Sequence, residues 1–183
     1  MANRAPGSLG LVQDFVNTRA FDPDREQIPT PEALGAWLRE RGLLGDEPVG
    51  EPDRLSALDL REALRRLLLA NNGAAPDPAD LELLNRIAEA GGLRPRFLPG
   101  GRLALEPAAH GVPGALGRLL AAVSDAMSAG AWSRLKACAD PGCLWVFYDR
   151  SRNRSGHWCS MEVCGNRAKA RQFRSRRRSP PGA

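Results

Sequence analysis

Residues 138–164 read CADPGCLWVFYDRSRNRSGHWCSMEVC and contain all four cysteines of the 183-residue chain. The cysteines form two pairs with four residues inside each pair, and fifteen residues separate the pairs. Structural zinc sites take four tetrahedral ligands, and thiolates are a common full set. Cysteine pairs at this separation leave room for a hairpin between them. The stretch therefore predicts a site for one Zn²⁺ per chain, with the ligands Cys138, Cys143, Cys159 and Cys164.

Disulfide bonds are the alternative use of these cysteines. The first residues, MANRAPGSLGLVQDF, contain no apolar run of signal-peptide length. No later segment approaches the roughly 18 uninterrupted apolar residues of a membrane span. A chain without an export signal is expected to stay in a reducing cytoplasm, where paired cysteines more often bind metal. We therefore expect zinc, a cytoplasmic location and no membrane partner.

The charge of the chain is unevenly distributed. Residues 134–183 carry 12 Lys and Arg against 3 Asp and Glu, a net charge of +9, whereas residues 1–133 carry a net charge of −4. An asymmetry of this kind indicates an anionic partner for the basic part alone. Arginine outnumbers lysine throughout the chain, so its predominance in this part is a weaker signal than the charge itself.

The first 136 residues are predicted to form a mainly helical domain. Apolar residues at helical spacing indicate helices near residues 9–18, 31–42, 53–71, 77–91 and 114–129. Thr30 and Asp53 are the expected N-caps of two of these helices, and Asp77 or Asp80 is expected to start the fourth. Leu55, Leu81 and Met127 are expected among the inward-facing residues. Residues 93–105 alternate arginine with apolar residues around Pro99-Gly100-Gly101, which predicts one β-hairpin. The fold class is therefore mainly α (α+β).

The cysteine-rich part is predicted to be a small treble-clef-like module, residues 137–178, followed by a disordered tail, residues 179–183. Residues 140–142 (DPG) supply a tight turn. Residues 144–148 are aromatic and β-branched, and we expect them to pair with a strand at His157-Trp158. Ser160 is the expected cap of a final helix that carries Cys164 in its first turn. We expect the module to pack on the preceding long helix through a continuous helical connection.

Arginines of the final helix recur at intervals of 4, 3 and 4 residues, which places them on one face of the helix. A second basic cluster lies between the cysteine pairs. A zinc-fixed helix with such a stripe suits the major groove or the phosphates of DNA, although a solvated basic face is the simpler interpretation of the stripe alone. The candidate nucleic-acid contacts are Arg150, Arg152, Asn153, Arg154, Asn166, Arg167, Lys169, Arg171, Arg174 and Arg178.

Residues 157–169, HWCSMEVCGNRAK, resemble the CGNR zinc-finger family, named for Cys-Gly-Asn-Arg. The resemblance includes all four cysteines, Asp149 and the basic turn at residues 151–154. The remainder of the chain is similar to the ABATE-type domain found before this finger, chiefly through residues 14–18 (DFVNT) and 132–136 (WSRLK). Such proteins are described as candidate bacterial regulators of stress-induced transcription. The resemblance implies a cytoplasmic DNA-binding protein.

Several roles inside the module have two interpretations. Gly165 is expected to let the backbone approach the metal site closely, or to be merely tolerated there. Asn166 either contacts nucleic acid or holds the thiolates in place, and contact with nucleic acid is favoured for Arg167. Trp145, Phe147 and Trp158 are expected to pack within the module and not to stack on bases.

No catalytic constellation is visible in the first domain, and we expect the protein not to be an enzyme. Asp14, Asn17 and Thr18 form its most suggestive polar cluster. They could bind a small-molecule effector, but capping the first helix and tying it to its neighbours is the favoured interpretation. A regulator also needs a sensing or dimerisation surface, so a homodimer is compatible with this function. The alternatives to DNA binding are RNA binding and a structural module for protein–protein interaction.

Overall fold

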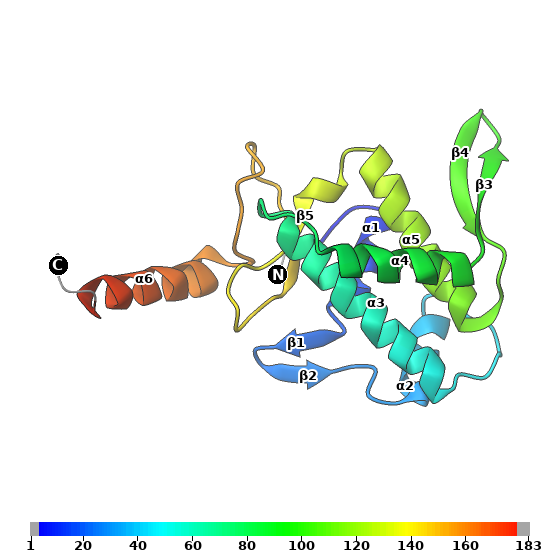
Figure 1. The fold of residues 1–183 in the computed structure, drawn as a ribbon, viewed down its shortest axis with the longest axis horizontal. Coiled ribbons are helices and arrows are strands. Elements are labelled where there is room, and N and C mark those ends of the chain that lie inside the picture. Colours follow the sequence, from blue (N-terminus) through cyan, green and yellow to red (C-terminus); the bar gives the residue numbers. More distant parts are fainter. Residues whose placement is uncertain (1–3, 179–183) are drawn as a thin grey trace.

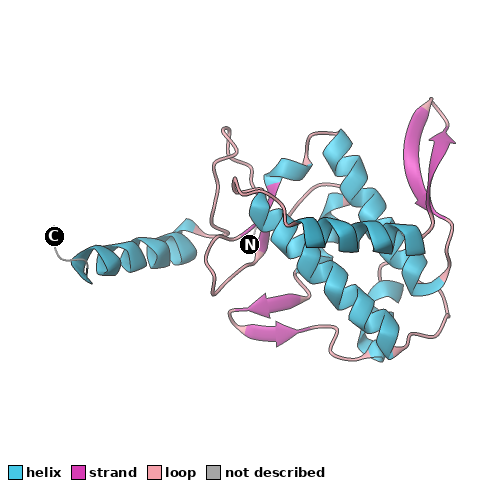
Figure 2. Ribbon diagram, viewed as in Figure 1, coloured by secondary structure: helices cyan, strands magenta, loops and turns pink. Residues whose placement is uncertain are grey.

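The computed structural model describes residues 4–178 of the protein and the side chains of residues 4–175. About half of the chain is helical, and three pairs of short antiparallel strands flank the helices (Figure 2). In chain order the elements are α1 (Leu9–Val16), β1 (Arg19–Phe21), β2 (Asp24–Glu26), α2 (Pro31–Arg39), α3 (Glu51–Ala70), α4 (Pro78–Ala90), β3 (Leu93–Leu98), β4 (Arg102–Pro107), α5 (Gly111–Ser128), the 3₁₀ turn η1 (Trp132–Arg134), β5 (Leu135–Ala137), β6 (Val146–Tyr148), the π-helical turn η2 (Met161–Gly165) and α6 (Asn166–Arg178). The mainly α fold class is confirmed, while the predicted tail at residues 179–183 lies outside the described residues.

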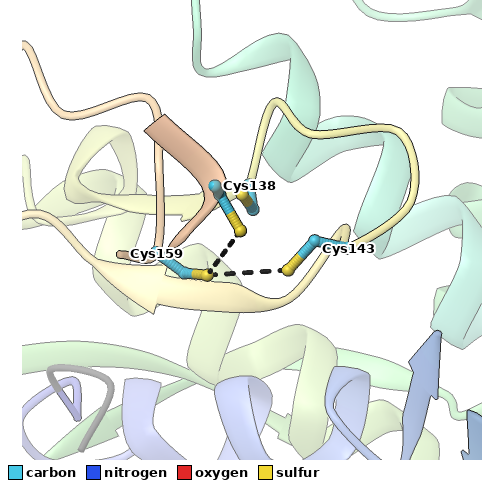
Figure 3. A group of neighbouring side chains, drawn as sticks. Cys138, Cys143 and Cys159 are labelled. Atoms are coloured by element: carbon cyan, nitrogen blue, oxygen red, sulfur yellow. Dashed lines mark hydrogen bonds between the residues drawn. The ribbon is translucent and has the colours of Figure 1, made fainter. Parts of the chain in front are cut away.

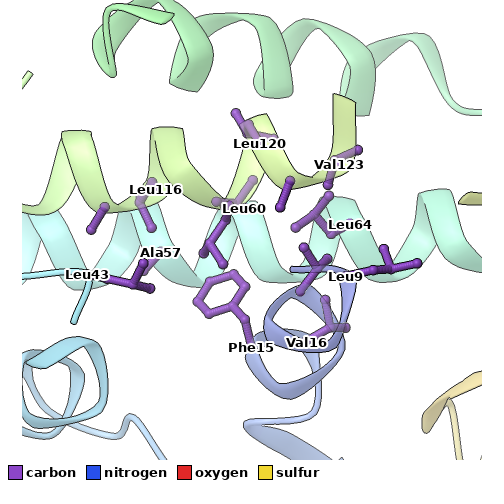
Figure 4. Packing of buried hydrophobic residues seen from close by; sticks show 14 of the residues in the cluster. Leu9, Phe15, Val16, Leu43, Ala57, Leu60, Leu64, Leu116, Leu120 and Val123 are labelled. Carbon is purple, nitrogen blue, oxygen red and sulfur yellow. The ribbon is translucent and has the colours of Figure 1, made fainter. Parts of the chain in front are cut away.

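The core lies where α1, α3 and α5 meet (Figure 4). Phe15 of α1 and Leu60 and Leu64 of α3 are fully buried there, and they lie against Leu116 of α5. The Phe15 ring also packs against Trp37 of α2, with 5.6 Å between ring centroids. Since each helix contributes one apolar face to this cluster, the helices fold as one body.

Local sequence signals set most helix ends. Thr30 caps α2, where its hydroxyl oxygen accepts the N–H of Ala33, and Asp77 caps α4. The predicted cap at Asp53 is wrong, because Gly50 is the N-cap of α3. Asp53 lies in the first turn, where its carboxylate accepts the Gly50 N–H at 2.9 Å. A side-chain acceptor at the third helical position can bind a free backbone N–H at the helix start, as the side chain of an N-cap residue does.

Three residues expected in the core are exposed. Leu55, Leu81 and Met127 have 50%, 42% and 47% of their surface accessible. Met127 lies next to the end of α5, on its buried face. Leu55 lies on the side of α3 opposite Leu60 and Leu64, the side of Asp59 and Arg66. The prediction for Leu55 therefore assigned it to the wrong face of the helix.

The strands differ from the prediction in two places. The hairpin of β3 and β4 is confirmed, but a second hairpin, β1 with β2, forms around Asp22-Pro23. In addition, β6 pairs with β5 and not with residues 157–158, which form no strand. The predicted continuous helical connection is also wrong, because η1 and β5 join α5 to the cysteines. Strand β5 packs mainly on α3, so the cysteine-rich module is docked there.

Candidate metal centre and nucleic-acid interface

The four cysteine side chains converge on one point (Figure 3, which labels three of them). All four are free thiols, and their sulfur atoms lie within 4.8 Å of one another. The Sγ–Sγ distances are 3.5 Å between Cys143 and Cys159 and 3.8 Å between Cys159 and Cys164. A regular tetrahedron with Zn–S bonds of about 2.3 Å has edges of about 3.8 Å. The four sulfur atoms therefore fit one zinc ion, as the sequence predicted.

The protonation of these thiols shows why a cation suits the site. Hydrogen bonds from the neighbouring thiols, that of Cys143 first, lower the pKa of Cys138 to about 2. Burial, the bond with Cys143 and the charge of Cys138 raise the pKa of Cys164 to about 12, and the thiol hydrogen bonds to Cys138 and Cys143 raise the pKa of Cys159. A negative charge on one thiol therefore disfavours deprotonation of its neighbours. A divalent cation reverses this opposition and holds all four as thiolates.

The first cysteine pair lies on a tight turn between β5 and β6. Asp140 is buried in this turn, and its Oδ1 accepts the Gly142 N–H at 3.2 Å. Past the second cysteine, Leu144 has a positive φ of 52°, and this turns the chain into β6. The segment that was predicted to pair with β6 makes instead one backbone bond to this turn, from the Ala139 N–H to the His157 carbonyl at 2.8 Å.

A buried ion pair shapes the basic turn at residues 150–156. Lys136 and Asp149 lie 3.2 Å apart, and both side chains are only 3% exposed. The Lys136 ammonium also donates to the carbonyls of Arg154 and Gly156, while the Asp149 carboxylate accepts the N–H groups of Ser151 and Gly156. Burial raises the pKa of Asp149, but these hydrogen bonds outweigh it and lower the pKa to about 2. The turn is therefore a fixed structure.

The second cysteine pair lies at the start of the final helix. Ser160 caps η2 through its hydroxyl, which accepts the Val163 N–H at 3.3 Å, as predicted. Gly165 is buried, and a Cβ at this position would lie 2.5 Å from the sulfur of Met161. The close approach expected at Gly165 is therefore made by the Met161 side chain. Asn166 donates to the Glu162 carbonyl at 2.8 Å, a bond inside the helix and not one to a thiolate.

Two arginines of the predicted stripe already contact carboxylates of the chain. Arg167 lies 2.5 Å from Asp22 at the tip of the β1–β2 hairpin, and Arg171 lies 3.1 Å from Asp140. Arg174 continues the same face one turn farther along α6, which extends away from the body (Figure 1). The Arg178 side chain lies outside the described residues. Phe173, also on α6, is 60% exposed.

The other candidate contact residues are all exposed. Arg150 donates to the Arg4 carbonyl, and Arg154 donates to the Ser133 hydroxyl. Among the described residues, the side chains of Arg152, Asn153, Lys169 and Arg174 make no hydrogen bond or ion pair. The three aromatic residues of the module pack as predicted, because Phe147 is buried and Trp145 and Trp158 lie against the cysteines.

Comparison with known families assigns both parts of the chain. Residues 134–177 match the CGNR zinc finger, and residues 9–134 match the ABATE family, described as "Putative stress-induced transcription regulator". The chain belongs to the ABATE family. A search of curated proteins found no match. The ABATE match ends at residue 134, where the match to the CGNR finger begins, next to the predicted boundary at residue 136. No helix of the described residues is long and apolar enough to cross a membrane.

The polar cluster of the ABATE domain ties this domain to the CGNR finger. Asn17 pairs with the backbone of Val146 in β6, with the Asn17 amide donating at 2.9 Å and accepting at 2.8 Å. Thr18 donates to the Phe15 carbonyl and accepts from Arg61, and Asp14 pairs with Arg4 at the surface. The structural interpretation of Asn17 and Thr18 thus accounts for their contacts.

Further ties of this kind had no signal in the sequence. Arg65 of α3 is 3% exposed and donates to the Leu144 carbonyl at 3.0 Å. Asn71 and Asn72, at the end of α3, donate to the carbonyls of Leu135 and Ala137. These side chains contact backbone carbonyls on both sides of the first cysteine pair. The position of the finger on the ABATE domain is therefore set by hydrogen bonds as well as by apolar packing.

Proposed function

We propose that the protein is a zinc-dependent DNA-binding regulator of transcription and not an enzyme. The observation that carries this proposal is the position of α6, a basic helix that starts at the thiolate cluster and extends from the body into solvent (Figure 1). Zinc would fix the root of this helix and thereby its direction. A closed four-thiolate site leaves no coordination position for a substrate, which argues against catalysis by the metal.

The unpaired basic side chains supply the contacts to DNA. Arg174 and Lys169 lie on α6, and Arg152 lies on the basic turn that Lys136 and Asp149 hold in place. Lys and Arg at such positions neutralise phosphates and release counterions. An exposed helix of 13 residues is also of a size to enter the major groove. The family description agrees with this function.

Titration of the zinc-loaded protein with labelled duplex DNA, duplex RNA and single strands over a salt series tests the proposal. We expect duplex DNA binding whose affinity falls with salt, with a log–log slope of about −0.9 per neutralised phosphate. Arg174→Ala should weaken binding severalfold and reduce that slope by about 1. Arg86→Ala, which removes an equal charge from the exposed face of α4, is the matched control. No binding to any nucleic acid at low salt would overturn the proposal.

One observation favours a second function. Arg167 and Arg171 bind carboxylates within the chain, so the same face could bind an acidic protein. In that case the titration with nucleic acids would be flat while zinc remains bound. RNA binding would show as a preference for duplex RNA or single strands in the same experiment.

A further inference from the structure

Of the four metal ligands, only Cys164 lies in the turn that leads into α6. This turn is the π-helical η2, and α6 begins directly after it at Asn166. Gly165 stands between the two residues, and its N–H closes the turn by donating to the Ser160 carbonyl at 3.1 Å. Helices bend readily at π-helical turns and near glycine. A metal ion at Cys164 therefore fixes where α6 begins, but the direction of the helix needs a second contact beyond this turn.

The ion pair between Arg171 and Asp140 is such a contact. Arg171 lies five residues after Asn166, which is about 7.5 Å along the helix axis. Its Nη1 lies 3.1 Å from Oδ1 of Asp140, which belongs to the turn between Cys138 and Cys143. The pair therefore joins α6 to the turn that carries the first cysteine pair, so it connects the same two halves of the finger that the metal ion connects.

The Asp140 carboxylate needs a cation at this place. Its side chain is only 2% exposed, and its Oδ1 accepts the Gly142 N–H at 3.2 Å. Its Oδ2 is buried and has no hydrogen-bond partner in the part of the chain that the structure describes. Burial of a carboxylate is costly unless the charge is paired, and a zinc ion with four thiolates adds negative charge close by. The half-exposed Arg171 supplies the opposite charge, and this attraction holds it against the turn.

We propose that Arg171 is a positioning residue that fixes the direction of α6, so that the arginine stripe is divided between two roles. Arg171 holds the helix against the zinc-binding turn, while Arg174, one turn farther along the same face, is left to bind a phosphate. A guanidinium that neutralises a buried carboxylate can neutralise a phosphate only by giving up that pair. A helix whose direction is already fixed also loses less freedom on binding. The role of Arg174 rests on the proposed function, whereas that of Arg171 does not.

Double electron–electron resonance on the zinc-loaded full chain, without DNA, measures the direction of α6. Nitroxide labels on p-acetylphenylalanine in place of the exposed Glu82 on α4 and Gln172 on α6 leave the cysteines unmodified. We expect a narrow distance distribution when Arg171 and Asp140 are both present. In Arg171→Gln the distribution should broaden by about 5 Å, because a swing of about 30° at η2 moves a label about 9 Å from the pivot by that much.

Two further variants identify the pair as the cause. Asp140→Asn keeps an oxygen for the Gly142 N–H and should broaden the distribution as Arg171→Gln does, and the double variant should broaden it no further. Arg174→Gln is the matched control, because it removes the same charge from the same face and should leave the distribution narrow. Zinc content measured on each sample confirms that the variants retain the metal. A broad distribution with the pair intact, or a narrow one in Arg171→Gln, would overturn the positioning role.

Titration with duplex DNA over a salt series tests the division of the stripe. Arg171→Gln should weaken binding severalfold with little change in the log–log salt slope, whereas Arg174→Gln should reduce that slope by about 1. A slope reduced by about 1 in Arg171→Gln would assign this arginine to a phosphate and contradict the division. Because the distance measurement contains no DNA, a failure of DNA binding and a failure of the positioning role are seen separately.

Discussion

The ABATE domain and the CGNR finger are stabilised by different means. The ABATE domain buries a continuous apolar core in which Phe15, Leu60 and Leu64 are inaccessible to solvent (Figure 4). The finger's own buried cluster consists of three cysteines, with Cys159 and two tryptophans packed against it. Burial of apolar surface contributes about 25 cal/mol per Å², whereas a module of this size depends on its metal. The comparison indicates that the two regions can be destabilised separately.

Loss of one metal ligand should have the largest effect and should remain inside the finger. Cys159→Ser is expected to abolish stoichiometric zinc binding, since a structural zinc contributes about 10–16 kcal/mol to such a module. Amide exchange in residues 157–165 should become fast, while α3 and α5 keep their protection because their core contains no ligand. Zinc content and hydrogen-exchange mass spectrometry measure both effects. Chelation of the wild type serves as control, and loss of protection throughout α3 would contradict the separation.

The boundary between the two regions should respond to Asn17. Asn17→Ala removes two hydrogen bonds to the backbone of Val146 and leaves the buried Val146 N–H without this acceptor. We expect a cost of about 2 kcal/mol in the free energy of unfolding. Asp14→Ala on the same helix removes an ion pair at the surface and should cost under about 1 kcal/mol. Urea unfolding of both variants gives the comparison. Equal costs would mean that Asn17 does not connect the domain to the finger.

Features set by local spacing could be predicted from the sequence, and features set by tertiary contacts could not. The zinc ligands, the cap at Thr30 and the β3–β4 hairpin follow from local spacing and were predicted correctly, and Asp77 is one of the two residues expected to start α4. Pairing of β5 with β6 was missed, because the strands have three residues each and the choice depends on packing against α3. Strand partners are selected by tertiary contacts more than by propensity.

The polar ties could not be predicted for a related reason. Arg65 lies 79 residues from the carbonyl of Leu144, and Asn17 lies 129 residues from Val146. Every residue has a backbone carbonyl, so the sequence does not show which carbonyl a side chain will contact. Arginine on a helix also usually indicates the solvent-exposed face. The same limit applies to Arg167, whose contact with Asp22 joins two segments that local patterns treat separately.

A charge pair of the ABATE domain should give a pH dependence that zinc does not influence. Burial raises the pKa of Glu26, but its bond to Arg61 at 2.7 Å and the Ile28 N–H lower it overall. The pair therefore stabilises the fold above the unfolded pKa of about 4.3, and this contribution is lost as pH falls through the lower folded pKa. Glu26→Gln should cost about 1 kcal/mol at neutral pH and progressively less below pH 4 or so. Thermal unfolding of both proteins in chelator measures this, and a constant difference would contradict it.

The smallest expected effect concerns the contact between the two regions at Asp22. Its carboxylate lies 2.5 Å from Arg167, where a DNA phosphate would compete for the same guanidinium. Asp22→Asn should therefore tighten duplex DNA binding by about two- to fivefold at low salt, with the gain fading as salt screens the charges. Asp24→Asn is a close control, because it removes the same charge from the same hairpin but Asp24 pairs with Arg19. An equal gain in both variants would reflect net charge alone. A gain confined to Asp22→Asn would mean that the ABATE domain restrains the basic helix through this one pair.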